Sequence, residues 1–139
     1  MLLLDTNVVS ELRKIHSGKA DENVSRRADT LATSELFLST ITVQELDVGV
    51  LLAERRDPHQ GRILRGWLET LVLPAFEGRI LTVDMAVARR AAKLHVQDPQ
   101  PINDALIAAT ALAHGMTLAT RNVFDFKGMG VQLLNPWGD

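Results

Sequence analysis

The stretch that decides the fold is MLLLDTN at residues 1–7, in which four apolar residues are followed at once by three polar ones. Three consecutive leucines do not alternate with polar residues, so they predict a short strand buried on both faces, as in a parallel sheet. Open α/β folds bind ligands at the carboxyl ends of such strands. We therefore expect Asp5 at the mouth of the fold, although it could also serve only to end the strand and cap a helix. We expect Asn7 to cap a helix over residues 8–14.

Length and composition favour a single domain spanning residues 1–139. The chain is long enough for one real core and too short for two. Because 46% of the residues are hydrophobic and only 4% are aromatic, the core should consist mainly of Leu, Val, Ile and Ala, which suits helices on a parallel sheet. The absence of cysteine excludes disulfides, cysteine-ligated zinc and thiol catalysis.

No segment approaches the roughly 20 apolar residues of a membrane span, so we expect no contact with a membrane. The amino terminus also lacks the basic region and apolar core of a signal peptide, because Asp5 interrupts it. We therefore expect a cytoplasmic protein. A net charge of −2 gives no general attraction for nucleic acid, so any nucleic-acid site would need a local basic rim.

Short strands alternate with helices along the rest of the chain. The pattern predicts strands at residues 36–39, 79–83, 116–119 and 131–134, and helices at 24–33, 43–56, 59–73, 85–96 and 101–114. Thr42 and Asp84 should cap two of these helices, and Pro74 should end a third. This alternation is typical of an α/β fold, a three-layer α/β/α sandwich with a mainly parallel central sheet.

Four acidic residues occupy equivalent places, at the ends of strands or the starts of helices. They are Asp5, Glu45, Asp104 and Asp125. Asp104 should face inward, because the residues three, four and seven positions later are apolar. Acids that converge on one edge of a parallel sheet repel one another, and such a group is typical of a site for Mg²⁺ or Mn²⁺. The helix dipole alone also favours acids in first helical turns, so each residue has a purely structural alternative.

Several sequence blocks carry a family resemblance. They are LLDTNVVSE at 3–11, LSTITVQEL at 38–46, FEGRIL at 76–81, Asp104 with IAATA at 107–111, LATRN at 118–122 and NPW at 135–137. In this order the blocks resemble PIN-domain ribonucleases, and among them the VapC-type toxins of bacterial toxin–antitoxin pairs, in the FitB-like branch. The resemblance implies a PIN-like fold and a Mg²⁺-dependent endoribonuclease. It also implies a homodimer and a small VapB-like antitoxin that carries the toxin to operator DNA.

The resemblance also assigns roles to the acids. Asp5, Glu45 and Asp104 match the three core acids of the family. FitB-type relatives carry the fourth acid directly after a Thr-Arg pair, where this chain has Asn122, so we assign the fourth position to Asp125. We expect all four acids to be catalytic and to bind the metal. The residues expected to contact the RNA substrate are Thr6, Thr120, Arg121 and Asn122, and the two threonines could instead hydrogen-bond the carboxylates.

Two other functions are compatible with parts of this pattern. A PIN-fold subunit could act mainly as a co-repressor or scaffold with a DNA-binding antitoxin, although the intact acids speak against scaffolding alone. A phosphatase of the haloacid type also clusters acids at a sheet edge, but it needs a second aspartate where this chain has Asn7. If an antitoxin binds, the first two predicted helices could receive a partner helix on Val9, Leu12 and Leu31.

Overall fold

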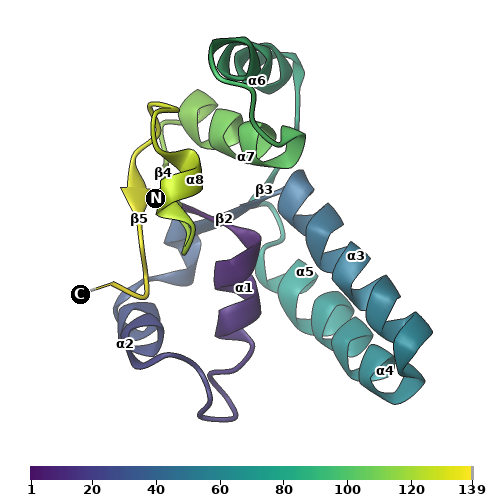
Figure 1. Ribbon diagram of the computed structural model, residues 1–139. Coiled ribbons are helices and arrows are strands. Elements are labelled where there is room, and N and C mark those ends of the chain that lie inside the picture. Colours follow the sequence, from purple (N-terminus) through teal and green to yellow (C-terminus); the bar gives the residue numbers. More distant parts are fainter. Residues whose placement is uncertain (139) are drawn as a thin grey trace.

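The structure, a computed structural model, describes residues 1–138 and places a small parallel sheet between two layers of helices (Figure 1). The strands are β1 (Leu2–Leu4), β2 (Leu36–Ser39), β3 (Ile80–Leu81), β4 (Thr117–Ala119) and β5 (Leu133–Leu134). They pair in the order β3-β2-β1-β4-β5, and every pair is parallel. The predicted α/β fold is confirmed, with the first strand at the centre of the sheet.

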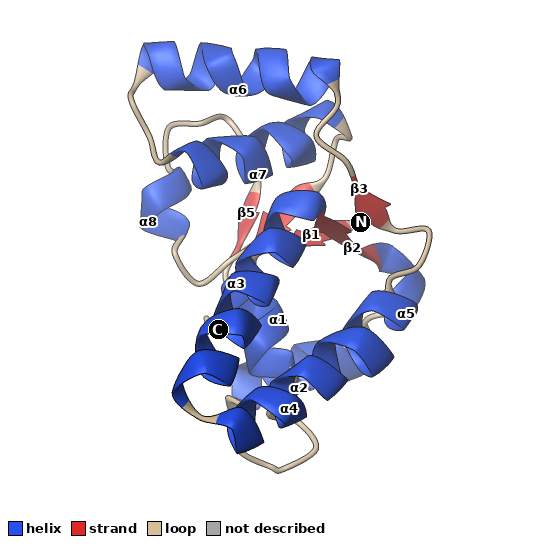
Figure 2. Ribbon diagram, turned by 90° about the vertical axis from the view of Figure 1, so that its right-hand side faces the viewer, coloured by secondary structure: helices blue, strands red, loops and turns tan. Residues whose placement is uncertain are grey.

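The helices lie on both faces of this sheet. They are α1 (Thr6–Leu12), α2 (Glu22–Thr30), α3 (Thr40–Arg56), α4 (Pro58–Trp67), α5 (Leu73–Ala75), α6 (Met85–Gln97), α7 (Ile102–Ala113) and α8 (Val123–Phe126), with a 3₁₀ turn at Thr33–Glu35 and a π-helical turn at Leu68–Val72. Figure 2 shows α6 and α7 on one side of the sheet and α1 to α5 on the other. Within residues 1–138, no helix combines the length and apolar character needed to cross a membrane.

The leucines of β1 divide the core into two halves. Leu3 is fully buried and belongs to a cluster with Ile107 and Leu118 on the α7 side, whereas Leu4 packs with Val8 and other residues on the opposite side. Successive side chains of a strand point to opposite faces, so a strand covered on both sides needs apolar residues at every position. Burying a leucine side chain fully contributes about 1.5–3 kcal/mol to the free energy of unfolding. Because Leu3 and Leu4 belong to different clusters, β1 stabilises both halves of the core.

Helices α3 and α4 form an antiparallel hairpin. Asp57 separates them, and its Oδ1 accepts hydrogen bonds from the backbone N–H groups of His59 and Gln60 at 3.1 and 3.4 Å. The helices approach closely at Gly61, where an added Cβ would lie 2.5 Å from the Cα of Glu54. A side chain at this position would force the two backbones apart, so the hairpin depends on a glycine there.

Two predicted helix caps were wrong by a few residues. Asp5, not Asn7, is the N-cap of α1, and Ser39, not Thr42, is the N-cap of α3, with its Oγ accepting from the N–H of Thr42 at 3.0 Å. In both places the last residue of the strand already carries a side-chain oxygen. It therefore caps the helix directly, and the chain passes from strand to helix without an intervening loop.

The predicted stop at Pro74 was also wrong, because helical structure continues to Ala75. The π-helical turn at Leu68–Val72 interrupts the hydrogen-bond pattern and places Pro74 in the first turn of α5, where a missing N–H costs least. On the predicted apolar face of this segment Leu68 is buried, but Ile63 and Leu71 are 49% and 58% exposed. The short helix α8 was not predicted, and β3 and β5 are shorter than expected.

Candidate active site

The four acidic residues come together at the carboxyl edge of the sheet. Asp5 directly follows β1, Glu45 lies in the second turn of α3, Asp104 lies in the first turn of α7, and Asp125 lies in α8. Glu45 was expected in a first turn, and it is one turn later because α3 begins at Thr40. The topology explains the convergence, since parallel strands end at one edge and the following helices begin there.

Asp5 is the most buried of the four, with 6% of its surface exposed. Its Oδ1 accepts a hydrogen bond from the backbone N–H of Thr6 at 2.8 Å, and its Oδ2 accepts one from the hydroxyl of Thr120 at 2.7 Å and one from the amide of Asn7 at 3.5 Å. Burial raises the pKa of Asp5, the bonds from Thr120 and Thr6 oppose the rise, and the charges of Glu45 and Asp125 add to it. These bonds fix the direction of the carboxylate.

Glu45 is held from both sides by polar side chains. Its Oε1 accepts a hydrogen bond from the hydroxyl of Thr6 at 2.5 Å, and its Oε2 accepts one from the amide of Asn103 at 3.3 Å. Sequence reasoning missed Asn103, although its place beside Asp104 at the start of a helix was a usable signal. Thr6 therefore links two of the acids, because its backbone contacts Asp5 and its side chain contacts Glu45.

Asp104 differs from the other acids because no hydrogen bond to its carboxylate is found within residues 1–138. It is half-buried. Burial is the largest cause that raises its pKa, to about 6, followed by the charges of Asp5, Glu45 and Asp125. The other three carboxylates therefore lie close enough to disfavour the ionisation of Asp104.

The residues that follow β4 form one rim of the site. Thr120 was expected to contact the substrate. It is instead fully buried, and its hydroxyl donates to Asp5. Arg121 is exposed, its backbone N–H donates to Oδ1 of Asn7 at 3.2 Å, and its guanidinium lies 5.1 Å from the ring centroid of Trp137. Asn122 and Asp125 are exposed, and the N–H of Asn122 donates to the Thr120 hydroxyl at 3.0 Å.

The donor set is suited in kind to a hard divalent cation. It consists of carboxylate, hydroxyl and amide oxygens, and in the described part of the chain none of the four acids forms an ion pair. In the same residues, 1–138, no three Asp, Glu, His or Cys side chains lie close enough to enclose a metal ion. The site thus carries oxygen ligands of the kind that Mg²⁺ prefers, with its carboxylates further apart than in a coordination shell.

Comparisons with known proteins show which family model and which relatives the chain matches. A family model described as the PIN domain matches residues 2–127. The chain is 39% identical to the VapC ribonuclease Y4jK of Sinorhizobium fredii, over 99% of this chain and 98% of the relative. It is 40% identical to toxin FitB of Neisseria gonorrhoeae, over the whole of both chains. A solved structure of FitAB bound to the IR36 DNA fragment superposes with a TM-score of 0.88 at 36% identity, covering 100% of this chain and 97% of that one.

Proposed function

The chain belongs to the PIN-domain family, and from this premise we propose that it is a Mg²⁺-dependent endoribonuclease that acts as the toxin of a toxin–antitoxin pair. The observation that carries the proposal is the group of four acids at the carboxyl edge of the sheet. No lysine or arginine neutralises them among the described residues, and burial, followed by the charges of the other three acids, raises the pKa of Asp104. Such a group is costly for a fold unless a cation offsets it.

Asp5 and Asp104 would hold Mg²⁺ most directly, with Glu45 and Asp125 holding it through water or orienting the attacking water. When bound, Mg²⁺ supplies a more acidic water and neutralises charge that builds on the phosphodiester. Mn²⁺ has the same ligand preferences and could replace it. Attack in line with the leaving oxygen would give products with a 5′-phosphate and a 3′-hydroxyl.

The polar residues around the acids have two kinds of role. The hydroxyls of Thr120 and Thr6 donate to Asp5 and Glu45, so they keep both carboxylates in fixed orientations. Arg121 is the best-placed contact for a phosphate, because its backbone is tied to Asn7 and its guanidinium rests on Trp137. Asn122, exposed beside it, can donate an amide hydrogen bond to the same strand of RNA.

The proposed partners are a VapB-like antitoxin, operator DNA reached through it, and a second copy of the chain. The likeness to the FitAB–DNA structure supports the first two. An apolar hollow between α1 and α2 is lined by Leu12, Ala28 and Leu31, among others, and could accept part of an antitoxin. Val9, expected in the same groove, is 2% exposed and packs in the core instead.

A second function, co-repression with a DNA-binding antitoxin, is favoured by the same FitAB–DNA likeness. It does not compete with cleavage, because the acids and the apolar hollow use different surfaces. The two functions separate in a variant that cannot cleave RNA but still binds its antitoxin. Such a variant should still repress its promoter while losing toxicity.

The decisive experiment compares wild type with Asp5→Asn on RNA in Mg²⁺ and in EDTA. We expect Asp5→Asn to lower the cleavage rate by about 100-fold or more, because the metal contributes several kcal/mol to the transition state. The fold should persist, since asparagine keeps an oxygen to accept from Thr6 and is an equally good N-cap. Thermal melting checks the fold. Cleavage by wild type in EDTA, or full cleavage by a folded Asp5→Asn, would overturn the proposal.

A further inference from the structure

A basic hollow lies at the end of α1 that is remote from the acids. It is lined by Arg13, Lys14, His16, Ser17 and Lys19, which are all exposed. None of these lining residues is acidic. Cations at the carboxyl end of a helix complement its dipole, so their presence there also has a purely structural explanation that a test must separate.

The loop that carries these residues has a defined shape. Oε1 of Glu11 pairs with Nζ of Lys14 at 3.1 Å, and Oε2 accepts a hydrogen bond from the backbone N–H of Asp21 at 2.8 Å, at the far end of the loop. Gly18 takes a positive φ of 71°, and its N–H donates to the carbonyl of Ile15 at 3.0 Å. The side chains around the hollow are therefore presented by a closed turn.

A second hollow lies between this basic site and the acids. Its lining includes Thr6 and Glu45, which are bonded to each other, together with Arg13, Trp67 and apolar residues of α3 and α4. Arg13 lines both hollows, so its side chain lies where the two meet. The seven residues of α1 span about 10 Å from the acidic edge to Arg13, a distance that a few linked nucleotides can cover.

Arg13 is held over the groove by an aromatic ring. Its guanidinium lies 5.9 Å from the ring centroid of Trp67 in α4, and no carboxylate in the described chain pairs with it. A guanidinium stacked on indole keeps its charge and its outward N–H donors. Arg13 can therefore contact an anion in the groove while remaining fixed in place.

We propose that the groove along α1 carries single-stranded RNA away from the acids, and that the hollow around Arg13 and Lys19 binds the phosphates of that RNA. This inference rests on the proposed function and names where the substrate lies beyond the scissile bond. Grooves for single strands commonly combine cations that follow the backbone with an aromatic surface. Cations beyond the cleavage site also offset the repulsion between RNA and the four carboxylates.

The test compares two double variants with the same change of charge. Arg13→Gln with Lys19→Gln removes two cations of the hollow, and Arg89→Gln with Lys93→Gln removes two exposed cations of α6. A fluorescent single-stranded RNA of 20 nucleotides is titrated in EDTA at several salt concentrations. We expect the first pair to weaken binding about tenfold and to reduce the salt slope by about 1.4, and the α6 pair to match wild type.

Cleavage kinetics in Mg²⁺ provide an independent readout. The hollow variant should raise KM and leave kcat unchanged, whereas a purely structural role at the end of α1 would lower the melting temperature without a specific rise in KM. Arg13→Lys keeps the charge but not the stacking. Its KM should lie between that of wild type and that of the hollow variant. Equal losses in both double variants, or unchanged RNA binding in the first, would overturn the inference. If wild type neither binds nor cuts RNA, the proposed function itself fails.

Discussion

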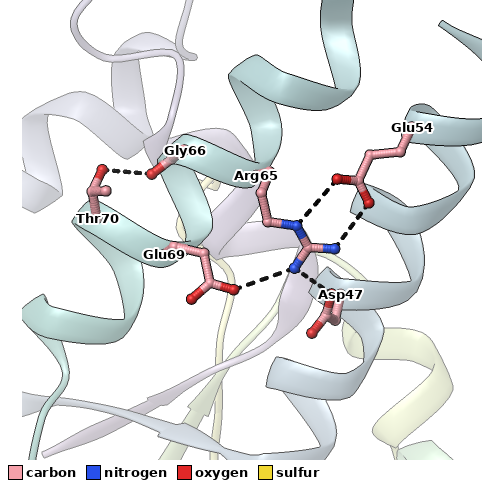
Figure 3. Close-up of polar contacts among 6 residues, drawn as sticks. All are labelled: Asp47, Glu54, Arg65, Gly66, Glu69 and Thr70. Carbon is pink, nitrogen blue, oxygen red and sulfur yellow. Dashed lines mark hydrogen bonds and ion pairs between the residues drawn. The ribbon is translucent and has the colours of Figure 1, made fainter. Parts of the chain in front are cut away.

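Two groups of carboxylates in this chain differ in whether a cation lies among them. Around Arg65, the carboxylates of Asp47, Glu54 and Glu69 share one guanidinium, at 2.9, 3.0 and 3.3 Å (Figure 3). At the carboxyl edge of the sheet, Asp5, Glu45, Asp104 and Asp125 share none. Helix α3 contributes to both groups, since Glu45 and Asp47 are two residues apart.

The difference shows in the pKa values. Hydrogen bonds from Arg65 lower the pKa of Glu54, and those same contacts raise the pKa of Arg65. Burial and neighbouring acids instead raise the pKa of Asp104 to about 6. The first group has a shared cation, which fastens α4 to α3. The second has no cation in the described chain, and we propose that an added cation binds there and stabilises the fold.

The sharpest way to break this comparison is to remove one carboxylate from each group on the same helix. We expect Glu45→Gln to lower RNA cleavage by about 100-fold or more, because it removes charge from the proposed metal site. Asp47→Asn removes one negative charge two residues further along α3. We expect it to leave cleavage within about twofold of wild type. Rates in Mg²⁺ with a labelled RNA measure both. Equal rates in the two variants would contradict the separation of the groups.

The pH dependence of stability sharpens the comparison next. In EDTA, the folded state holds a proton on Asp104 up to a pH of about 6, above the usual pKa of 3.8, so stability falls as the pH rises from about 4 to 6. We expect Asp104→Asn to remove this fall and to be the more stable protein above pH 6. Because Asp104 is only half-buried, solvent screening limits the gain to about 1 kcal/mol, or about 4 °C in Tm.

Mg²⁺ should reverse the order of stability of wild type and Asp104→Asn. Millimolar Mg²⁺ should stabilise wild type by offsetting the repulsion, and it should stabilise Asp104→Asn less, since one ligand is gone. Melting curves of both proteins at pH 4.5 and 7.5, each with and without Mg²⁺, measure these differences in Tm. If Asp104→Asn melts below wild type in EDTA at pH 7.5 and gains as much from Mg²⁺, Asp104 is a structural cap and lies outside the acidic group.

The sequence was sufficient to predict the architecture because the burial pattern of the strands is strong. Apolar runs such as Leu2–Leu4 and Leu36–Ser39 have only one good explanation, and they set the sheet and the edge where the acids converge. Asn7 and Thr42 were predicted as caps, but Asp5 and Ser39 are both strand ends and helix caps. For Asp5 this double role was the alternative interpretation, whereas for Ser39 it was not predicted.

The contacts that tune the site were harder to predict because they join distant segments. Thr120 supports Asp5 across 115 positions, and Asn103 supports Glu45 across 58. A bond from Thr120 to a carboxylate was one of the roles expected for it. Which acid it bonds, and the bond from Asn103, do not follow from local periodicity, since they depend on side-chain rotamers in the folded chain. The π-helical turn before Pro74 was not predicted for a similar reason, because tertiary packing rather than helix propensity decides it.

The smallest expected effect concerns the complete group. Arg65→Gln leaves Asp47, Glu54 and Glu69 without their shared cation, so we expect a modest loss of Tm that shrinks in high salt, since all of these side chains are partly exposed. Cleavage should be unchanged. Arg62→Gln, one turn earlier on α4 and in no ion pair among the described residues, is the control and should have no effect on Tm. A Tm that is unchanged in Arg65→Gln at low salt would show that Gly61 and apolar packing hold the hairpin without help from Arg65, because three neighbouring carboxylates should repel one another once their shared cation is gone.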